Sequence, residues 1–339
     1  MGRKIWTGIF ACLGMTVLIL DAKTALMGGT QGLQICLSTV IPSLLPFFFL
    51  SILLSSSITG LNIPLLRPTS KLCRIPRDSE SIFILGLLGG YPTGAQAVSQ
   101  AYRAGQLSKT DARRMLGFCS NAGPSFLFGI LSPIFPHWWI PWVLWLIHIL
   151  SALLTGYLLP GGSGDTAHIP PAPKLTVTEA LERSIKIMAR VCGWIILFRI
   201  LLAFFGRWFF WPLPQPFPAA IMGVVELANG CMQLPLVSNL GLRMVLCSAF
   251  LSFGSLSVLM QTASVTAPLG LGMYLPGKGI QTAISLLLTI PVQSILLSSQ
   301  EKIAISPLAI GISALFLIFT LLYLKKREKN SSIPAYLGV

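Results

Sequence analysis

The sequence is short of charge, and above all of negative charge. Only 10% of its 339 residues are Asp, Glu, Lys or Arg, and 10 acidic residues stand against 24 basic ones, for a formal net charge of +14. Soluble proteins carry about 25% charged residues, so this chain has too little charge to cover a water-facing surface. Hydrophobic residues make up 54% of it, and its mean hydropathy is +0.78. Together these values predict an all-α protein that crosses a membrane several times.

The motifs of common catalytic and metal sites are also missing. The seven cysteines form no CxxC pair and are interpreted as small apolar residues. The three histidines stand alone, without HExxH spacing. GGYPTG (89–94) matches the start of a Walker A loop, but Ala95 and Gln96 follow where Lys and Ser or Thr are required. We therefore expect no enzyme, no metal, no cofactor and no ATP-driven transport within this chain.

The first residues resemble a signal peptide, because Arg3 and Lys4 precede an apolar core. No clear small-x-small cleavage site follows, so an uncleaved first span is favoured over a cleaved signal.

Apolar segments alternate with connectors rich in proline, glycine or charge along the whole chain. The segments are 5–20, 33–58, 81–100, 115–133, 138–160, 191–211, 219–235, 240–266, 280–298 and 303–324. Two of them, 81–100 and 219–235, are short and polar in the middle, and we predict that each forms a re-entrant helical hairpin. About eight transmembrane helices then remain. Residues 176–190 are expected to form an amphipathic surface helix with Leu181, Ile185 and Met188 on one face.

Basic residues gather on one side of this layout. With the N-terminus in the cytoplasm, 19 of the 24 Lys and Arg residues fall in cytoplasmic segments, as the positive-inside rule requires. Those segments are the two termini and the connectors 61–80, 101–114, 161–190 and 267–279, the last of which contains Lys278. Topology thus accounts for the net charge, and no nucleic-acid partner is expected.

The segments on either side of the central connector follow the same order with opposite orientation: a span, a hairpin, an interrupted span and an ordinary span. Inverted repeats with broken helices are the architecture of secondary transporters. The predicted units are an N-terminal span (1–32), a first repeat (33–160), a connector with the amphipathic helix (161–190), a second repeat (191–298) and a C-terminal span with a basic tail (299–339). The interrupted spans of the two repeats are the broken helices 115–133 and 240–266.

Polar residues beside the breaks are the candidate substrate-binding residues. In lipid, irregular backbone survives only where protein or water satisfies it, and broken helices expose N–H groups and carbonyls that bind anions and cations. The predicted cavity includes the hairpin tip 91–94 and is lined by Thr93, Gly94, Gln96, Ser120, Asn121, Ser125, Glu226, Asn229, Ser255, Ser257 and Gln261. The alternative is that these small and polar residues serve helix packing.

Glu226 is the one carboxylate in the intramembrane segments, where an ionisable group is by default functional or paired. We expect it to bind a coupling cation, a proton or the substrate. The alternative is a structural ion pair with Arg243 or Arg199. Arg243 is also a candidate for substrate binding, whereas Arg207 and Arg243 could instead reach the outer interface with their long side chains.

Four stretches resemble the YlbJ family of sporulation integral membrane proteins, within a region of roughly 33–300. They are GLLGGYPTGAQAVSQAYRAGQLSKTDARRMLGFCSNAGPSFLFG (86–129), ELANG (226–230), FLSFGSLSVLMQ (250–261) and MYLPGKGIQTAIS (273–285). These are nucleoside-recognition or Gate domains, which are distantly similar to the hairpin and broken-helix repeats of concentrative nucleoside transporters. Ser255 stands where the family's FGG pattern has a second glycine.

The resemblance implies a transporter of endospore formers. Proteins of this kind lie in the membrane around the developing spore and pass dipicolinic acid from the mother cell toward the forespore. The implied localisation is the outer forespore membrane, with both termini cytoplasmic. The expected partners are an anionic small molecule and the lipid bilayer, and a homo-oligomer or other sporulation membrane proteins stay open. Two alternatives also stay open, a nucleoside carrier and a non-transporting membrane scaffold.

Overall fold

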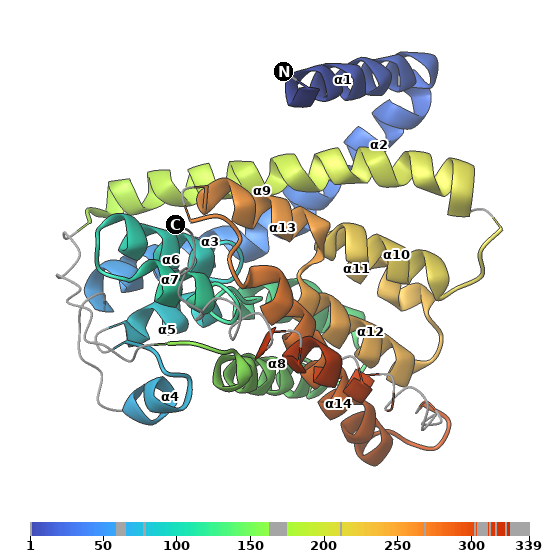
Figure 1. The fold of residues 1–339 in the computed structure, drawn as a ribbon. Coiled ribbons are helices and arrows are strands. Elements are labelled where there is room, and N and C mark those ends of the chain that lie inside the picture. Colours follow the sequence, from blue (N-terminus) through green and yellow to red (C-terminus); the bar gives the residue numbers. More distant parts are fainter. Residues whose placement is uncertain are drawn as a thin grey trace, which may run out of the picture.

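In the computed structural model the chain folds into helices joined by short connectors (Figure 1). The structure describes residues 2–58, 66–76, 79–162, 175–210, 212–267, 269–301 and 303, together with 311, 313–315, 317–322 and 324–325, and none of these lies in a β-strand. The prediction of an all-helical protein is confirmed. The helices are α1 (Gly2–Leu20), α2 (Ala22–Ile35), α3 (Ile41–Ile58), α4 (Arg67–Leu72), α5 (Glu80–Leu88), α6 (Thr93–Arg103), α7 (Lys109–Met115), α8 (Ile140–Leu158), α9 (Val177–Phe205), α10 (Phe217–Val225), α11 (Leu227–Gln233), α12 (Leu240–Phe253), α13 (Ser255–Val265) and α14 (Tyr274–Leu296).

Within the described residues, five helical segments are long and apolar enough to span a membrane. They are Ala22–Ile58, Ile140–Leu158, Val177–Phe209, Leu240–Val265 and Tyr274–Leu296. A helical membrane protein with several spans is thus confirmed, whereas the predicted count of eight spans is not reached.

The shortfall has local causes. In α1 the apolar stretch Ile5–Leu20 is shorter than the 18 residues of a candidate span. The predicted span 115–133 is not one helix, because α7 ends at Met115 and residues 116–123 contain no helix before the π-helical turn η3 (Ser125–Leu131). We call residues 116–123 the first break. Part of the predicted span 303–324, the basic tail after Lys325 and residues 163–174 of the connector lie outside the described residues.

The predicted surface helix 176–190 is the start of α9, a continuous helix of 29 residues. Thr176 caps it: its hydroxyl accepts a hydrogen bond from the N–H of Glu179 (3.2 Å), and the Glu179 carboxylate accepts one from the N–H of Thr176 (2.8 Å). No proline interrupts the segment, so the helix continues along one side of the molecule (Figure 1).

The three residues predicted on one apolar face of 176–190 have different surroundings in the structure. Met188 is buried, but Leu181 and Ile185 are exposed. The inward face consists instead of Ala180, Ser184, Met188, Val191 and Ile195. The small side chains of Ala180 and Ser184 leave room for neighbouring helices. A search for large apolar residues overlooks such positions.

Each predicted hairpin corresponds to a pair of short helices in backbone contact. In the first pair, α5 and α6, a Cβ placed on Gly94 would lie 2.7 Å from the Cα of Gly86. In the second pair, α10 and α11, a Cβ on Gly230 would lie 2.1 Å from the Cα of Gly223. Such approaches are open only to glycine. The insertion of the pairs from opposite sides of a membrane, and with it the inverted repeat, stays a prediction.

The second break lies between α12 and α13. Gly254 has a φ of +84°, and Ser255 follows with a φ of +70°. Left-handed backbone favours glycine, and Ser255 is the position at which the resembling family has its second glycine. The Ser255 hydroxyl accepts a hydrogen bond from the N–H of Val258 (3.4 Å) within the first turn of α13.

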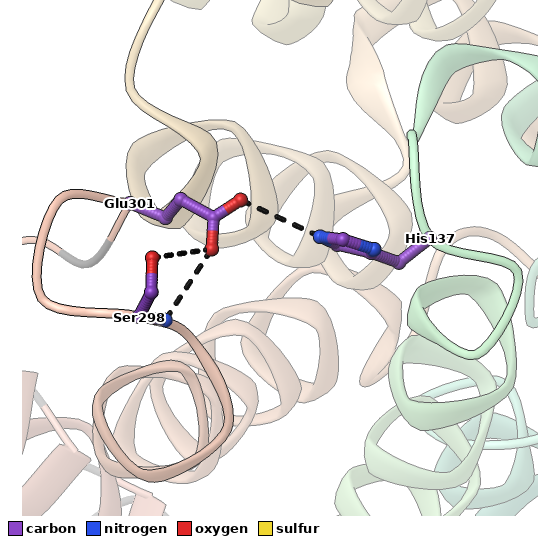
Figure 2. A network of polar contacts seen from close by, with 3 residues as sticks. All are labelled: His137, Ser298 and Glu301. Atoms are coloured by element: carbon purple, nitrogen blue, oxygen red, sulfur yellow. Dashed lines mark hydrogen bonds and ion pairs between the residues drawn. The ribbon is translucent and has the colours of Figure 1, made fainter.

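A polar cluster joins the loop before α8 to the turn after α14 (Figure 2). One carboxylate oxygen of Glu301 lies 3.4 Å from Nε2 of His137, and the other accepts hydrogen bonds from the hydroxyl (2.6 Å) and the N–H (3.3 Å) of Ser298. The bonds from Ser298, followed by the contact with His137, hold the pKa of the Glu301 carboxyl below its ordinary value.

Candidate functional site

A central cavity of about 50 Å³ lies where the two helix pairs meet the first helix break and α13, the helix that follows the second break. Its polar and irregular wall consists of residues 89–91, Ala122, Gly123, Ser125, residues 226–228, Val258 and Gln261. Apolar side chains from η1 (Cys36–Val40), α3 and α9 close the remaining sides. Of the predicted site residues, Ser125, Glu226 and Gln261 are therefore brought together around one space, although they are far apart in the sequence.

Glu226 is buried at the junction of α10 and α11, where it forms the N-cap of α11. Its carboxylate accepts hydrogen bonds from the N–H (2.6 Å) and the side-chain amide (2.7 Å) of Asn229. Neither arginine that was considered as its partner pairs with it: Arg199 donates to Gln31 (2.6 Å), and Arg243 donates to backbone carbonyls. The carboxylate thus reaches the cavity while held by a helix N-terminus, a favourable place for negative charge.

Gln261 reaches the cavity from α13, one turn beyond Ser257. Its side-chain amide donates a hydrogen bond to the Ser257 hydroxyl (3.3 Å). Ser257 and Asn229 therefore orient cavity residues and do not line the cavity themselves.

A second cavity, of about 200 Å³, lies between α3, α6 and α9. We call it the basic vestibule and define it by Arg183, Lys186 and Arg190 of α9, Thr93, Gln96 and Gln100 of α6, and Ser51 and Ser55 of α3. None of the described residues that line it is acidic. The predicted site residues Thr93 and Gln96 thus belong to the vestibule and not to the central cavity.

A narrow gap of about 10 Å³ lies between the two spaces. It shares Gln96 and Arg190 with the vestibule, and Val191 and Gln261 with the central cavity. The three spaces therefore form a continuous series, closed in this conformation by side chains of α6, α9 and α13.

Ser120 and Asn121 face α14 and not the central cavity. The ammonium of Lys278, which is 0% exposed, donates hydrogen bonds to the carbonyl of Ser120, to Oε1 of Gln281 (2.7 Å) and to the hydroxyl of Tyr91 (3.1 Å). Gln281 in turn donates to Oδ1 of Asn121 (2.9 Å). A polar network thus links α14 to the first break and to the α5–α6 junction.

Two predicted site residues have other surroundings. Arg243 donates to the carbonyls of Ile134 (3.1 Å), Val237 (2.9 and 3.3 Å) and Pro235 (3.4 Å). Gly94 lies at the contact between α5 and α6. Neither lines the central cavity or the vestibule, so Arg243 holds loops together and Gly94 permits helix packing.

From the sequence, Lys278 and the three vestibule cations are predicted only to set the topology. A signal for Lys278 was present, because it is a single cation in an apolar stretch with Gln281 one helical turn later. The three cations of α9 recur at positions 183, 186 and 190, a spacing of three and four residues that puts them on one helix face.

The spans, the broken helices and the central cavity define a polytopic helical membrane protein with a buried site. This chain is similar to the sporulation integral membrane protein YlbJ of Bacillus subtilis (strain 168), with 32% identity over 103 residues. The aligned stretch covers 30% of this chain and 25% of that protein. The resemblance seen over residues 33–300 is thus supported over a shorter stretch. No family model and no solved structure matches the chain.

Proposed function

We propose that this chain is a secondary transporter that carries a small organic anion across a membrane during sporulation, with dipicolinate as the substrate. The observation that carries the proposal is the position of the central cavity, which touches both helix-pair junctions, the first helix break and the helix that follows the second break. Transporters bind their substrates where broken helices of two repeats meet. A helix bundle that serves only as a scaffold has no need to gather its irregular backbone around one space.

The size of the cavity fits an occluded conformation. About 50 Å³ holds one or two water molecules, since one water occupies about 30 Å³ in the liquid. A pyridine ring with two carboxylates is larger, so the substrate enters only when the wall moves. The wall is irregular at residues 89–91 and 226, where the chain can change direction without breaking a regular helix.

The basic vestibule supports an anion as the substrate class. Arg183, Lys186 and Arg190 face one space without an acidic lining residue, and such a surface raises the local concentration of anions. Arginine binds carboxylates through two parallel hydrogen bonds. Dipicolinate is a planar dianion, so each of its two carboxylates can bind one arginine side chain. A neutral nucleoside carries no charge that would be stabilised by three cations.

The biological setting is supported by the similarity to YlbJ, which is described as a sporulation integral membrane protein. Together with the five candidate spans, this similarity favours a membrane role in sporulation. We propose the outer forespore membrane as the location and transport toward the forespore as the direction.

The test is uptake of labelled dipicolinate by liposomes that contain the purified protein, with labelled uridine as the comparison. The variant Arg190→Gln removes the cation shared by the vestibule and the narrow gap. We expect the KM for dipicolinate to rise about tenfold, because a hydrogen bond to a charged group contributes about 1.5–3 kcal/mol. Lys71→Gln is the matched control, since Lys71 is an exposed cation on α4 outside the vestibule.

Each alternative has its own outcome in this assay. Uptake of uridine but not of dipicolinate would identify a nucleoside carrier. Uptake of neither compound would contradict the proposal and favour a scaffold. An unchanged KM in Arg190→Gln, with dipicolinate uptake intact, would mean that dipicolinate does not reach the central cavity through the vestibule.

A further inference from the structure

Lys278 is a buried cation without a carboxylate partner. Lys278 lies on α14, and its side chain is fully buried inside the protein. Among the described residues, the ion pairs within 4.0 Å join His137 to Glu301 and Arg207 to Asp21, and neither includes Lys278. A charge within a membrane-spanning helix costs several kcal/mol and marks an ion or proton pathway by default. The burial of Lys278 therefore needs an explanation beyond helix packing.

The surroundings of Lys278 match an ammonium ion. An ammonium has three N–H donors and no acceptor, and here three oxygens accept from it, those of Ser120, Gln281 and Tyr91. A neutral amine has two N–H donors and a lone pair, so one of these oxygens would lose its hydrogen bond. The three contacts thus depend on the proton.

The titratable groups around Lys278 come from several elements. The rings of Tyr91 and Tyr274 lie 5.1 and 5.8 Å from its nitrogen, and their faces attract a cation. Cys119 lies in the first break, and His148 lies on α8, where its Nε2 accepts an N–H from the first break (3.1 Å). None of these four groups carries a negative charge at neutral pH in its usual form, so Lys278 alone carries the charge.

Lys278 also connects the two helix breaks. It donates to the Ser120 carbonyl at the first break. Its partner Tyr91 donates a hydrogen bond to the carbonyl of Leu251 (3.0 Å), in the last turn of α12 before the second break. Carbonyls freed at helix breaks and at the ends of half-helices are the groups that coordinate Na⁺ in secondary transporters.

We propose that Lys278 is the coupling site of the transporter: its ammonium takes the place of an inorganic cation between the two breaks, and transport is linked to protonation of Lys278 and not to Na⁺. This inference rests on the proposed transport function. Lysine, unlike arginine, can give up its proton in a protein. When it does, the Tyr91 hydroxyl accepts that proton and gives up its own, turning its O–H from the Leu251 carbonyl toward water in the central cavity, which Tyr91 lines. The neutral amine then releases one acceptor, and the breaks can separate.

The first arm of the test uses the wild-type protein in liposomes, with the membrane potential clamped by potassium and valinomycin. We expect a pH gradient to drive accumulation of labelled dipicolinate in the absence of Na⁺. One pH unit sustains about tenfold accumulation for each coupled proton. A dye that reports internal pH should show proton movement on addition of dipicolinate. Uptake that requires Na⁺, or that does not depend on the pH gradient, would overturn the inference about Lys278 but would still agree with the proposed transport function. No uptake under any gradient would contradict the transport function itself.

The second arm uses Lys278→Gln, which removes the titrating group but keeps an N–H donor for the Ser120 carbonyl. We expect it to lose accumulation driven by the pH gradient and the dye signal, yet to retain exchange of labelled for unlabelled dipicolinate. Lys109→Gln, at an exposed position of α7, is the control and should behave as the wild type. Wild-type accumulation in Lys278→Gln would refute the inference. Tyr91→Phe supplies a second variant, because it removes the hydroxyl that accepts from Lys278 and should reduce the number of protons moved per substrate.

Discussion

Replacing Gly94 by alanine tests the contact that fixes the first helix pair. A methyl group on Gly94 would lie 1.9 Å from the carbonyl oxygen of Cys119 and 2.7 Å from the Cα of Gly86, whereas real Cβ atoms essentially never approach within 3.0 Å. The Cys119 carbonyl would have to move by 1.1 Å, the difference between 3.0 and 1.9 Å. Both obstacles are backbone atoms that no side-chain rotation removes, so we expect a cost of about 3 kcal/mol, the upper part of the usual range for overpacking.

A helical alanine is otherwise favoured over glycine by about 1 kcal/mol, which leaves a net loss of about 2 kcal/mol, or roughly 5 °C in melting temperature. The assay is thermal unfolding of the purified protein in detergent, followed by size-exclusion chromatography. Gly193→Ala is the matched control, because Gly193 lies in helix α9 and a Cβ there meets nothing within 4 Å. It should leave the melting temperature unchanged or raise it. Equal melting temperatures for the two variants would refute the packing of α6 against α5 and the first break.

Four other substitutions probe the cavity, a surface contact and the topology. The Glu226→Gln variant should reach normal levels in the membrane, because the glutamine oxygen can still accept the N–H of Asn229. It should strongly reduce dipicolinate uptake. Loss of the protein from the membrane would indicate that the carboxylate is structural instead. The lowered pKa of Glu301 means that its contribution to stability is present above the ordinary value of 4.5 and is lost as the pH falls through the lowered one. Glu301→Gln should therefore flatten the fall in melting temperature below about pH 4.5, and an unchanged profile would contradict this. For the topology, single cysteines are placed at Gln106 and Gln215 in a protein that lacks the exposed Cys12. In intact cells an impermeant thiol reagent should label the cysteine at 215 and leave the one at 106 unlabelled. The reverse result would mean that the topology is inverted.

Local signals were sufficient to locate the irregular backbone. Glycine next to a polar residue marked the second break at Gly254, and the polar run after Val225 marked the junction at Glu226. Both features depend on residues that are neighbours in the chain: a left-handed turn that glycine adopts readily and a carboxylate that caps the helix following it.

Contacts between distant residues could not be predicted in this way. The hydrogen bonds of Lys278 to Tyr91 and Ser120 span 187 and 158 residues, and a lysine near the start of a span looks the same in sequence whether it faces the cytoplasm or a buried carbonyl. The contacts of Arg243 could not be predicted for the same reason, because one of its carbonyl partners, Ile134, is 109 residues away. The residues next to an arginine in the sequence do not indicate which distant loop will lie beside it in the fold.

The length of α9 makes the thickness of the surrounding membrane relevant to the vestibule. Its 29 residues extend about 44 Å at 1.5 Å per residue, against a hydrocarbon core of about 30 Å. Even at the average tilt of about 20°, roughly 10 Å of the helix lies beyond the hydrocarbon. The charged residues gather in its N-terminal part, so the end that extends beyond the hydrocarbon is the one that bears Arg183 and Lys186. In a thinner bilayer these cations would stand clear of the lipid headgroups, and in a thicker one the headgroup phosphates would compete with an incoming anion for them.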